Sequence, residues 1–371
     1  MYLGTFGFGG PIALAGYMQK DLVEKRRWIS KRDYVDGLAL AQLAPGPLAA
    51  QLAMYLGYVR AGVLGATAVA FAFILPSFLM VLVISWLYVR FGGLAWMQAL
   101  FYGIGAAVIG IIVRSAYKLV KLTLGKDKGL WAIFIALALV TAVAQTEIAW
   151  LFFLAGFVYL AIKVPVARWM TASAASLGLL CLRGSAEAAT TEVVPATALR
   201  VLGFFAKAGA MVFDSGLAIV PFLYGGVVNE YHWLTERQFM DAVAVAMITP
   251  GPVVITVAFI GYLVRGLWGA SLAALGVFLP VYLFVVIPSR WFKKYATDIR
   301  LNAFVTGVTA AATGAIAGAC VVLAKRAVVD IPTALIALVT LVVLIKVKKV
   351  PEPLIIVVAG VLGLLLFKST P

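Results

Sequence analysis

The chain is poor in the residue types that most often carry out catalysis. Only 12% of its 371 residues are charged, and it has one histidine, His232, and two cysteines. Cys181 and Cys320 lie far apart without CxxC spacing, which excludes a disulfide framework and a cysteine metal cluster. The sequence contains no HExxH or GxSxG motif, and a single histidine offers little acid–base capacity. We therefore expect no enzyme, no metal site and no cofactor.

Acidic residues are also scarce, with 15 Asp and Glu against 30 Lys and Arg, and the formal net charge is +15. The basic residues are scattered between apolar segments instead of gathered on one module with aromatic residues, which argues against nucleic-acid binding. Hydrophobic residues make up 64% of the chain, and the mean hydropathy is +1.06. Segments of about 20 apolar residues are typical of membrane-spanning helices, so the composition indicates a multi-pass protein of the lipid bilayer.

The sequence repeats itself over nearly its whole length. The triplet Pro45-Gly46-Pro47, here the first break, recurs as Pro250-Gly251-Pro252, the second break, and each lies within an apolar segment. A near-constant offset of 205 residues before the breaks and 204 after them relates many other positions. Examples are Trp28 and Trp233, Asp36 and Asp241, Gly57 and Gly261, Gly62 and Gly266, and Gly110 and Gly314. This pattern predicts a first transmembrane repeat over 1–163, a linker over 164–200 and a second repeat over 201–371.

The basic loops predict how the first repeat crosses the membrane. Loops 19–36 and 114–128 are both rich in Lys and Arg, so the positive-inside rule places both in the cytoplasm. Three apolar segments separate them, and one must therefore turn back. The segment 37–59 is the candidate because it contains the first break, and the segment 2–18 is the alternative. The first apolar segment has no basic region before it, so we expect it to belong to the fold and not to a signal peptide.

Each repeat would then cross the membrane five times. Because five is an odd number, the second repeat would be inverted relative to the first. The loop 229–241 agrees, because it is acidic where its counterpart 19–36 is basic. Three basic residues disagree, since this topology places them outside: Arg265, Lys325 and Arg326. The predicted fold is an all-α integral membrane protein with about ten transmembrane helices plus two broken, re-entrant helices, in two inverted-topology repeats.

The breaks suggest where a ligand binds. Proline has no backbone N–H, and a break inside a membrane is tolerated only where it lines a cavity or is packed within protein. Inverted repeats with broken helices are the architecture of secondary transporters, in which helix N-termini can face an anion. The alternative is that each break is only a kink relieved by packing.

Polar residues near the breaks are further candidates. Gln42, Gln51 and Thr249 are uncharged groups suited to an oxyanion, although such residues also form interhelical hydrogen bonds. Lys207 and Asp214 are ionisable residues inside an apolar segment, where we expect Lys207 to attract an anion and Asp214 to carry a proton. The alternative is that Lys207 reaches the lipid headgroups and Asp214 caps a helix.

Several motifs together resemble the chromate ion transporter family. They are Phe8-Gly9-Gly10-Pro11, Leu43-Ala44-Pro45-Gly46-Pro47, Leu75-Pro76-Ser77 and Thr249-Pro250-Gly251-Pro252. The resemblance implies efflux of chromate across the inner membrane, with sulfate as a structural mimic. By position it implies a site made of Gly9, Gly10, Pro11, Asp36, Gln42, Pro45, Gly46, Pro47 and Gln51, with Pro250, Gly251 and Pro252. The second repeat departs from the pattern, because Asp214 stands where a carboxylate would repel a dianion.

The sequence thus predicts a secondary transporter that exports chromate or a related tetrahedral oxyanion by alternating access. A passive oxyanion channel is the first alternative, and a membrane enzyme acting on lipid phosphates is the second. The expected partners are the oxyanion, the bilayer and, as candidates, a proton and a second copy of the chain in a homodimer.

Overall fold

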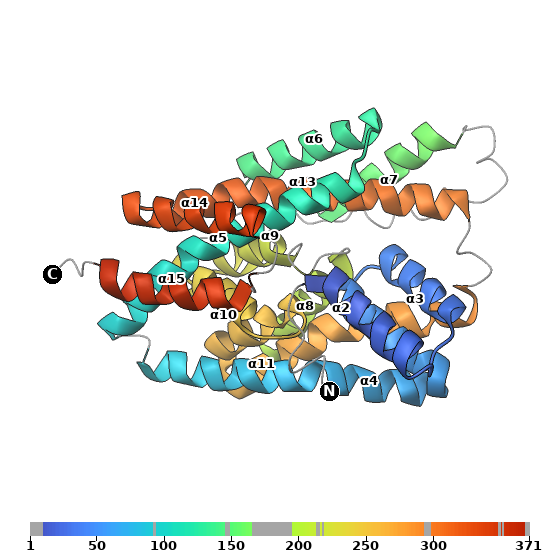
Figure 1. Ribbon diagram of the computed structural model, residues 1–371, viewed down its shortest axis with the longest axis horizontal. Helices are drawn as coiled ribbons and strands as arrows, with labels where there is room; N and C mark the ends of the chain where they lie inside the picture. The colour runs from blue at the N-terminus through green and yellow to red at the C-terminus, as the bar shows by residue number, and fades with distance from the viewer. Residues whose placement is uncertain are drawn as a thin grey trace.

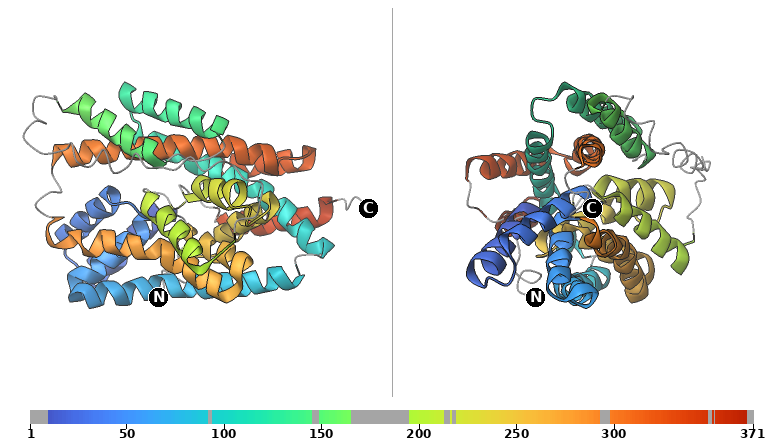
Figure 2. Two further views of the ribbon diagram at one scale, coloured as in Figure 1. Left: turned by 180° about the vertical axis from the view of Figure 1, so that it is seen from behind. Right: turned by 90° about the vertical axis from the view of Figure 1, so that its right-hand side faces the viewer.

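The structure is a computed structural model that describes residues 10–91, 94–144, 149–164, 195–212, 216, 219–292, 298–347, 350 and 352–367. Every regular element within these residues is a helix, and the all-α prediction is confirmed. Figure 1 shows the longest helices lying roughly along one axis of the molecule. The end-on view in Figure 2 shows them packed as a bundle.

The first half of the chain contains seven of the described helices. They are α2 (Gly10–Met18), the π-helix η1 (Gln19–Lys25), α3 (Lys31–Leu43), α4 (Leu48–Phe91), α5 (Ala95–Thr123), α6 (Lys128–Ala144) and α7 (Ala149–Lys163). The second half begins with α8 (Ala198–Met211), α9 (Ile219–Tyr224), the π-helix η4 (Gly225–Glu230), α10 (Glu236–Ile248) and the short η5 (Val253–Ile255). It continues with α11 (Thr256–Val286), η6 (Pro288–Arg290), α13 (Ile299–Ala327), α14 (Ile331–Lys346) and α15 (Glu352–Leu366).

Four helical stretches of the described chain are long and apolar enough to cross a membrane. They are Leu48–Phe91, Ala95–Thr123, Val253–Arg290 and Ile299–Ala327. The helices α6, α7, α14 and α15 are apolar but shorter than the roughly 20 residues that a straight crossing requires. The lengths and compositions are those of an integral membrane protein.

The duplication is visible in the backbone as well as in the sequence. Both α4 and α11 contain a sharp kink, at Gly62 (φ 59°, ψ −147°) and at Gly266 (φ 62°, ψ −151°). Among the described non-glycine residues, Arg27 and His232 adopt a left-handed φ of 52°, each just after a π-helix. These pairs are 204 and 205 residues apart, so the two halves share the same unusual local geometry.

The chain reverses direction at the first break, as expected for the segment 37–59. A Cβ atom at Gly37 on α3 would collide with Tyr55, and it would also lie 3.2 Å from Leu52 Cδ1, both on α4. Gly37 and Tyr55 are equally far in sequence from Gly46, one before it and one after it, and they are neighbours in space. The arms α3 and the start of α4 form a hairpin whose tip is the first break.

The segment 203–228, expected to cross as one helix, is interrupted. Helix α8 ends at Met211 and α9 begins at Ile219. The ring of Phe204 on α8 stacks on Phe222 with centroids 5.5 Å apart, and it also lies against Gly226. The two arms are thus side by side and form another hairpin. Hydropathy alone missed this interruption because the intervening residues 212–218 contain no proline and are mostly apolar or small.

Helices of each half pack against helices of the other half, and equivalent helices run in opposite directions. Helix α13 packs against α6 and α7 of the first half, and its counterpart α5 packs against α14 and α15 of the second. Asp330 follows the end of α13 and accepts a hydrogen bond from Tyr102 near the start of α5. The equivalent helices α5 and α13 are therefore antiparallel to each other, as inverted repeats require. Which end faces the cytoplasm stays a prediction.

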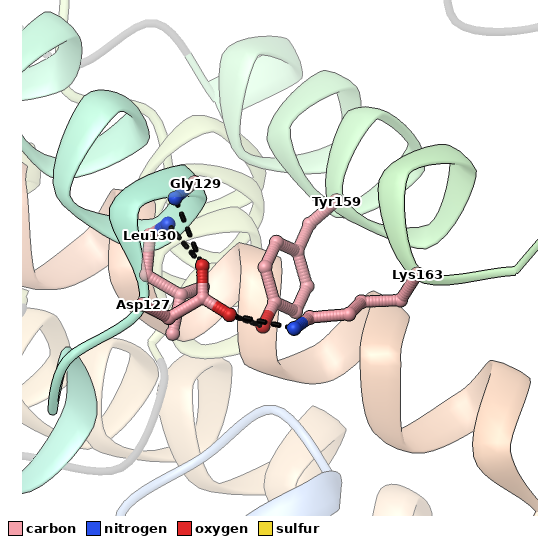
Figure 3. Close-up of polar contacts among 5 residues, drawn as sticks. All are labelled: Asp127, Gly129, Leu130, Tyr159 and Lys163. Carbon is pink, nitrogen blue, oxygen red and sulfur yellow. Dashed lines mark hydrogen bonds and ion pairs between the residues drawn. The ribbon is translucent and has the colours of Figure 1, made fainter.

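A polar cluster joins α6 to α7 at one end of the bundle (Figure 3). Asp127 precedes α6 and accepts hydrogen bonds from the backbone N–H groups of Gly129 and Leu130. Its second carboxylate oxygen accepts from Tyr159 Oη at 2.9 Å and pairs with Lys163 Nζ at 2.7 Å. The hydrogen bond from Lys163 is the main reason that the pKa of Asp127 falls to about 2. One carboxylate thus caps α6 and holds the end of α7.

We expect Asp127→Ala to destabilise the protein by about 1 kcal/mol at neutral pH, because it removes a helix cap and an ion pair. A carboxylate whose pKa is lowered by folding stabilises the folded state above its unfolded pKa of about 4, and that contribution is lost as the pH falls toward 2. Thermal unfolding in detergent measures both effects. The control is Asp21→Ala, which removes an ion pair to Arg26 whose two side chains are about half exposed. Equal melting temperatures for the two variants at neutral pH would contradict this role.

Candidate functional site

The two breaks lie close together. The backbone N–H of Gly46, in the first break, donates a hydrogen bond to the carbonyl oxygen of Val212 at 2.6 Å. A Cβ atom at Gly216 would lie 3.2 Å from Val254 Cγ2, just after the second break. Val212 and Gly216 are four residues apart, so at most about 14 Å of chain separates them. Breaks 205 residues apart in sequence therefore converge on the same part of the molecule.

Both breaks require glycine for a steric reason. The φ angle is +142° at Gly46 and +105° at Gly251, a region that side chains with a Cβ rarely adopt. A Cβ atom at Gly46 would also lie 2.5 Å from Gln51 Nε2 and 3.1 Å from Val281 Cγ1. Backbone and side chains are therefore packed tightly around the first break.

Side-chain groups near the breaks bond to the backbone. Gln51, which is fully buried, donates through Nε2 to the carbonyl oxygens of Pro45 at 2.7 Å and Ala44 at 3.3 Å. The buried hydroxyl of Thr249 donates to Val245 O at 3.1 Å, and that of Thr256 donates to Val253 O at 2.7 Å. The carbonyls of Val245 and Val253 also accept the backbone N–H groups of the same threonines, so among these groups only Gln51 supplies a side-chain donor to carbonyls at the break itself.

The helix N-termini after the breaks retain free backbone donors. The N–H groups of Ala50 and Gln51 bond the carbonyl of Pro47 at 3.0 and 3.1 Å, whereas those of Leu48 and Ala49 bond no described residue. At the second break the N–H of Ile255 bonds the carbonyl of Pro252 at 2.9 Å, whereas those of Val253 and Val254 bond no described residue. Helix N-termini carry a partial positive charge and bind anions through such groups.

The remaining predicted residues are dispersed. Gln42 is exposed on α3, and Lys207 is exposed on α8 with Nζ 5.9 Å from the ring centroid of Phe222. Asp36 is half-buried on α3 and close enough to Tyr55 to interact with it electrostatically. Gly10 and Pro11 begin α2. Gly9 and Asp214 lie outside the described residues, so the predicted proton site at Asp214 stays a prediction.

Comparison with known proteins identifies the family. The sequence pattern described as "Chromate transporter" matches residues 1–178 and 199–364, which correspond to two repeats. The chain belongs to the chromate transporter family. It is 59% identical to a chromate transport protein of Cupriavidus metallidurans over 98% of this chain and 91% of that protein. It is 54% identical to a probable chromate transport protein of Synechococcus elongatus over 99% of this chain and 94% of that protein.

A more distant member, a chromate transport protein of Pseudomonas aeruginosa, is 33% identical over 89% of this chain and 80% of that protein. No solved structure matches the chain. The relatives are named as transport proteins, in agreement with the expectation of a non-enzyme, and the long apolar helices place this family member in a membrane.

Sequence reasoning missed one buried polar contact between the halves of this chromate transporter family member. Asp241 on α10 is 6% exposed, and its Oδ2 accepts a hydrogen bond from Tyr88 Oη on α4 at 2.7 Å. The Tyr88 ring packs edge-on against Phe101 and Phe259. Asp241 drew notice only as the counterpart of Asp36, although a carboxyl group at the edge of an apolar segment is itself a signal. Tyr88 gave no signal in the sequence.

We expect Tyr88→Phe to lower the free energy of unfolding by about 1–3 kcal/mol, because it leaves a buried carboxyl group without its partner and keeps the ring packing. The control Tyr282→Phe removes a hydroxyl that bonds Thr67 Oγ1 at 2.7 Å, a neutral partner, and should cost less, about 1 kcal/mol. Unfolding followed by tryptophan fluorescence gives both values. A smaller loss for Tyr88→Phe than for Tyr282→Phe would show that the contact with Asp241 is not important for stability.

Proposed function

We propose that this chain is a secondary transporter that exports chromate across the inner membrane by alternating access around the two breaks. The observation that supports it best is the convergence of the breaks, where Gly46 bonds Val212 and Gly216 contacts Val254. Equivalent helix N-termini from two antiparallel repeats meet at this place. The chromate transport proteins among its relatives supply the choice of substrate.

The proposed site binds the anion through backbone N–H groups. The donors are Leu48 and Ala49 after the first break, with Val253 and Val254 after the second. Among the described residues, the buried polar and charged side chains include no lysine or arginine. Binding therefore depends on helix N-termini, and sulfate, which has the same shape, is a candidate competitor. Gly9, Gly10, Pro11 and Pro252 complete the proposed site by their positions in the two repeats.

Alternating access is the mechanism that the arrangement of the repeats favours. Ala50 and Val254, next to the two breaks, are fully buried, whereas Pro45 and Gly251 are half-buried. Related repeats that run in opposite directions can exchange conformations and open the site to each side in turn. The membrane potential, negative inside, assists export by about 2.3 kcal/mol per negative charge per 100 mV. A passive channel would instead conduct far faster than a transporter turns over.

The coupling ion and the assembly are part of the proposal. Asp36 and Asp214 are the candidate proton carriers, and Lys207, exposed at the surface of α8, is the candidate for attracting the anion. A homodimer is the proposed assembly, and the surrounding lipid is the other partner.

We expect Gly46→Leu and Gly251→Leu to abolish chromate transport without preventing membrane insertion, because no leucine side chain fits these backbone conformations. Uptake of labelled chromate into everted vesicles, with sulfate as competitor, measures the effect. The control is Gly105→Leu on α5, where a Cβ atom would meet nothing within 4 Å. Normal uptake by either break variant at equal membrane content would rule out a site at the breaks.

The proposed inversion has its own test at two equivalent loop positions. Arg27 and His232 share the same backbone conformation, and opposite topology places them on opposite sides of the membrane. We expect a membrane-impermeant thiol reagent added outside to label His232→Cys and not Arg27→Cys, in a background that lacks Cys181 and Cys320. Labelling of both positions from one side would contradict the inversion.

A further inference from the structure

The amide of Gln51 has one oxygen without a partner. Its Nε2 faces the carbonyl oxygens of Ala44 and Pro45, and only a nitrogen can donate to both, so the orientation of the amide is fixed. The other end, Oε1, is fully buried and accepts no hydrogen bond from the part of the chain that the structure describes. A buried carbonyl oxygen without a donor costs about 1–3 kcal/mol, so this position favours a ligand that can donate a hydrogen bond.

This acceptor lies at the proposed anion site. Gln51 is three residues after Leu48, and its side chain reaches back to residues that precede the break. The amide therefore lies across the N-terminal end of the helix, where the N–H groups of Leu48 and Ala49 are free of described partners. The site thus offers hydrogen-bond donors together with one acceptor. A fully deprotonated oxyanion can use the donors but not the acceptor.

The charges around the site oppose a dianion. The buried polar and charged side chains of the described chain include no lysine or arginine that could neutralise it. Asp36 on α3 is close enough to Tyr55, one turn beyond Gln51, to interact with it electrostatically, and an ionised carboxylate there would repel an anion. The cost of burying an ion rises with the square of its charge, so a dianion suffers far more than a monoanion in such surroundings.

We infer that the transported species is the protonated monoanion, hydrogen chromate, whose hydroxyl group donates to Gln51 Oε1 while its other oxygens accept from the helix N-termini. This inference rests on the proposed function and specifies its substrate. The proton enters with the anion from water and leaves with it, so this step needs no change of protonation at Asp36 or Asp214, which remain the candidate carriers of a separate coupling proton. The described titratable and charged groups on the helices around the first break are Lys31, Arg32, Asp33, Tyr34 and Asp36 on α3, Tyr55, Tyr58, Arg60, Tyr88 and Arg90 on α4, Arg200 and Lys207 on α8, Glu236, Arg237 and Asp241 on α10, and Tyr262, Arg265 and Tyr282 on α11.

Recognition of a hydroxyl group would separate chromate from sulfate. The two dianions have the same tetrahedral shape, and backbone N–H groups alone do not distinguish them. The second dissociation of chromic acid occurs near neutral pH, whereas that of sulfuric acid is complete far below it. A cell therefore contains hydrogen chromate but hardly any hydrogen sulfate. Gln51 would select the oxyanion by its protonation state.

The first test uses the unmodified, full-length protein in liposomes. At constant total chromate, we expect the initial rate of uptake to fall about tenfold per pH unit above the second pKa of chromic acid. In a second series the total chromate is raised with pH so that hydrogen chromate stays constant, and we expect a constant rate. A rate that follows the dianion concentration, or that varies with pH at constant hydrogen chromate, would overturn the inference.

The second test counts charges. The reversal potential of chromate flux, measured with imposed ion gradients, gives the net charge moved per chromate, and we expect one negative charge. A value of two would overturn the inference and leave the proposed function intact. An absence of any chromate flux would instead overturn the proposed function.

The third test changes the acceptor. We expect Gln51→Leu to reduce uptake at least about tenfold, because the hydroxyl group of the substrate loses its partner. The control is Thr313→Val on α13, which removes another fully buried polar group whose hydroxyl bonds Thr309 O at 2.7 Å, and which should leave uptake unchanged. A folded Gln51→Leu protein with an unchanged rate and pH profile would contradict the role of Gln51. If that variant does not fold, the first two tests decide the matter without it.

Discussion

The structure depends on how backbone polar groups are satisfied where helices break inside an apolar interior. An unpaired group at such depth costs several kcal/mol, so every break needs partners. At the first break, Gln51 binds the carbonyl oxygens of Ala44 and Pro45, and the N–H of Gly46 binds Val212 from the other half of the chain. A break in one repeat is therefore completed by the other repeat. Neither half could form the proposed site alone, which accounts for the extensive exchange of helix contacts between them.

Duplication has preserved the backbone more strictly than the side chains. Asp127 and Asp330 precede the equivalent helices α6 and α14, each caps its helix, and each accepts a hydrogen bond from a tyrosine. Among the described residues, Asp127 also binds a lysine, Lys163, whereas Phe367, at the equivalent position of the second half, packs on the ring of Tyr102. The same divergence affects the breaks, since no glutamine follows the second one. The two halves of the proposed site therefore differ in chemistry although they share a shape.

Local chemistry made part of this architecture predictable. Proline and glycine determine backbone geometry within a few residues, so the first break and the reversal of 37–59 could be predicted. The interruption of 203–228 was not predicted, because residues 212–218 contain no proline and are mostly apolar or small, and the alternative that Asp214 caps a helix was its one signal in the sequence. The contact between Tyr88 and Asp241 joins residues 153 positions apart and depends on tertiary packing. The donors of Gln51 and Thr249 were predicted from residue type, but residue type does not reveal that they bind the backbone.

Two of the three basic residues that opposed inversion, Arg326 and Arg265, have contacts in the structure. Arg326 pairs with Glu236, and Arg265 donates to the carbonyl of Ala196, so neither is an isolated charge. The bond from Arg265 to Ala196 places the start of α8 beside the kink of α11. At the other end of α11, Leu160 of α7 lines a pocket together with Pro288 and Trp291. The straight part of α11, from Gly266 to Val286, is about 30 Å long. Val164 and Pro195, the described residues that flank the linker, therefore lie toward opposite ends of α11.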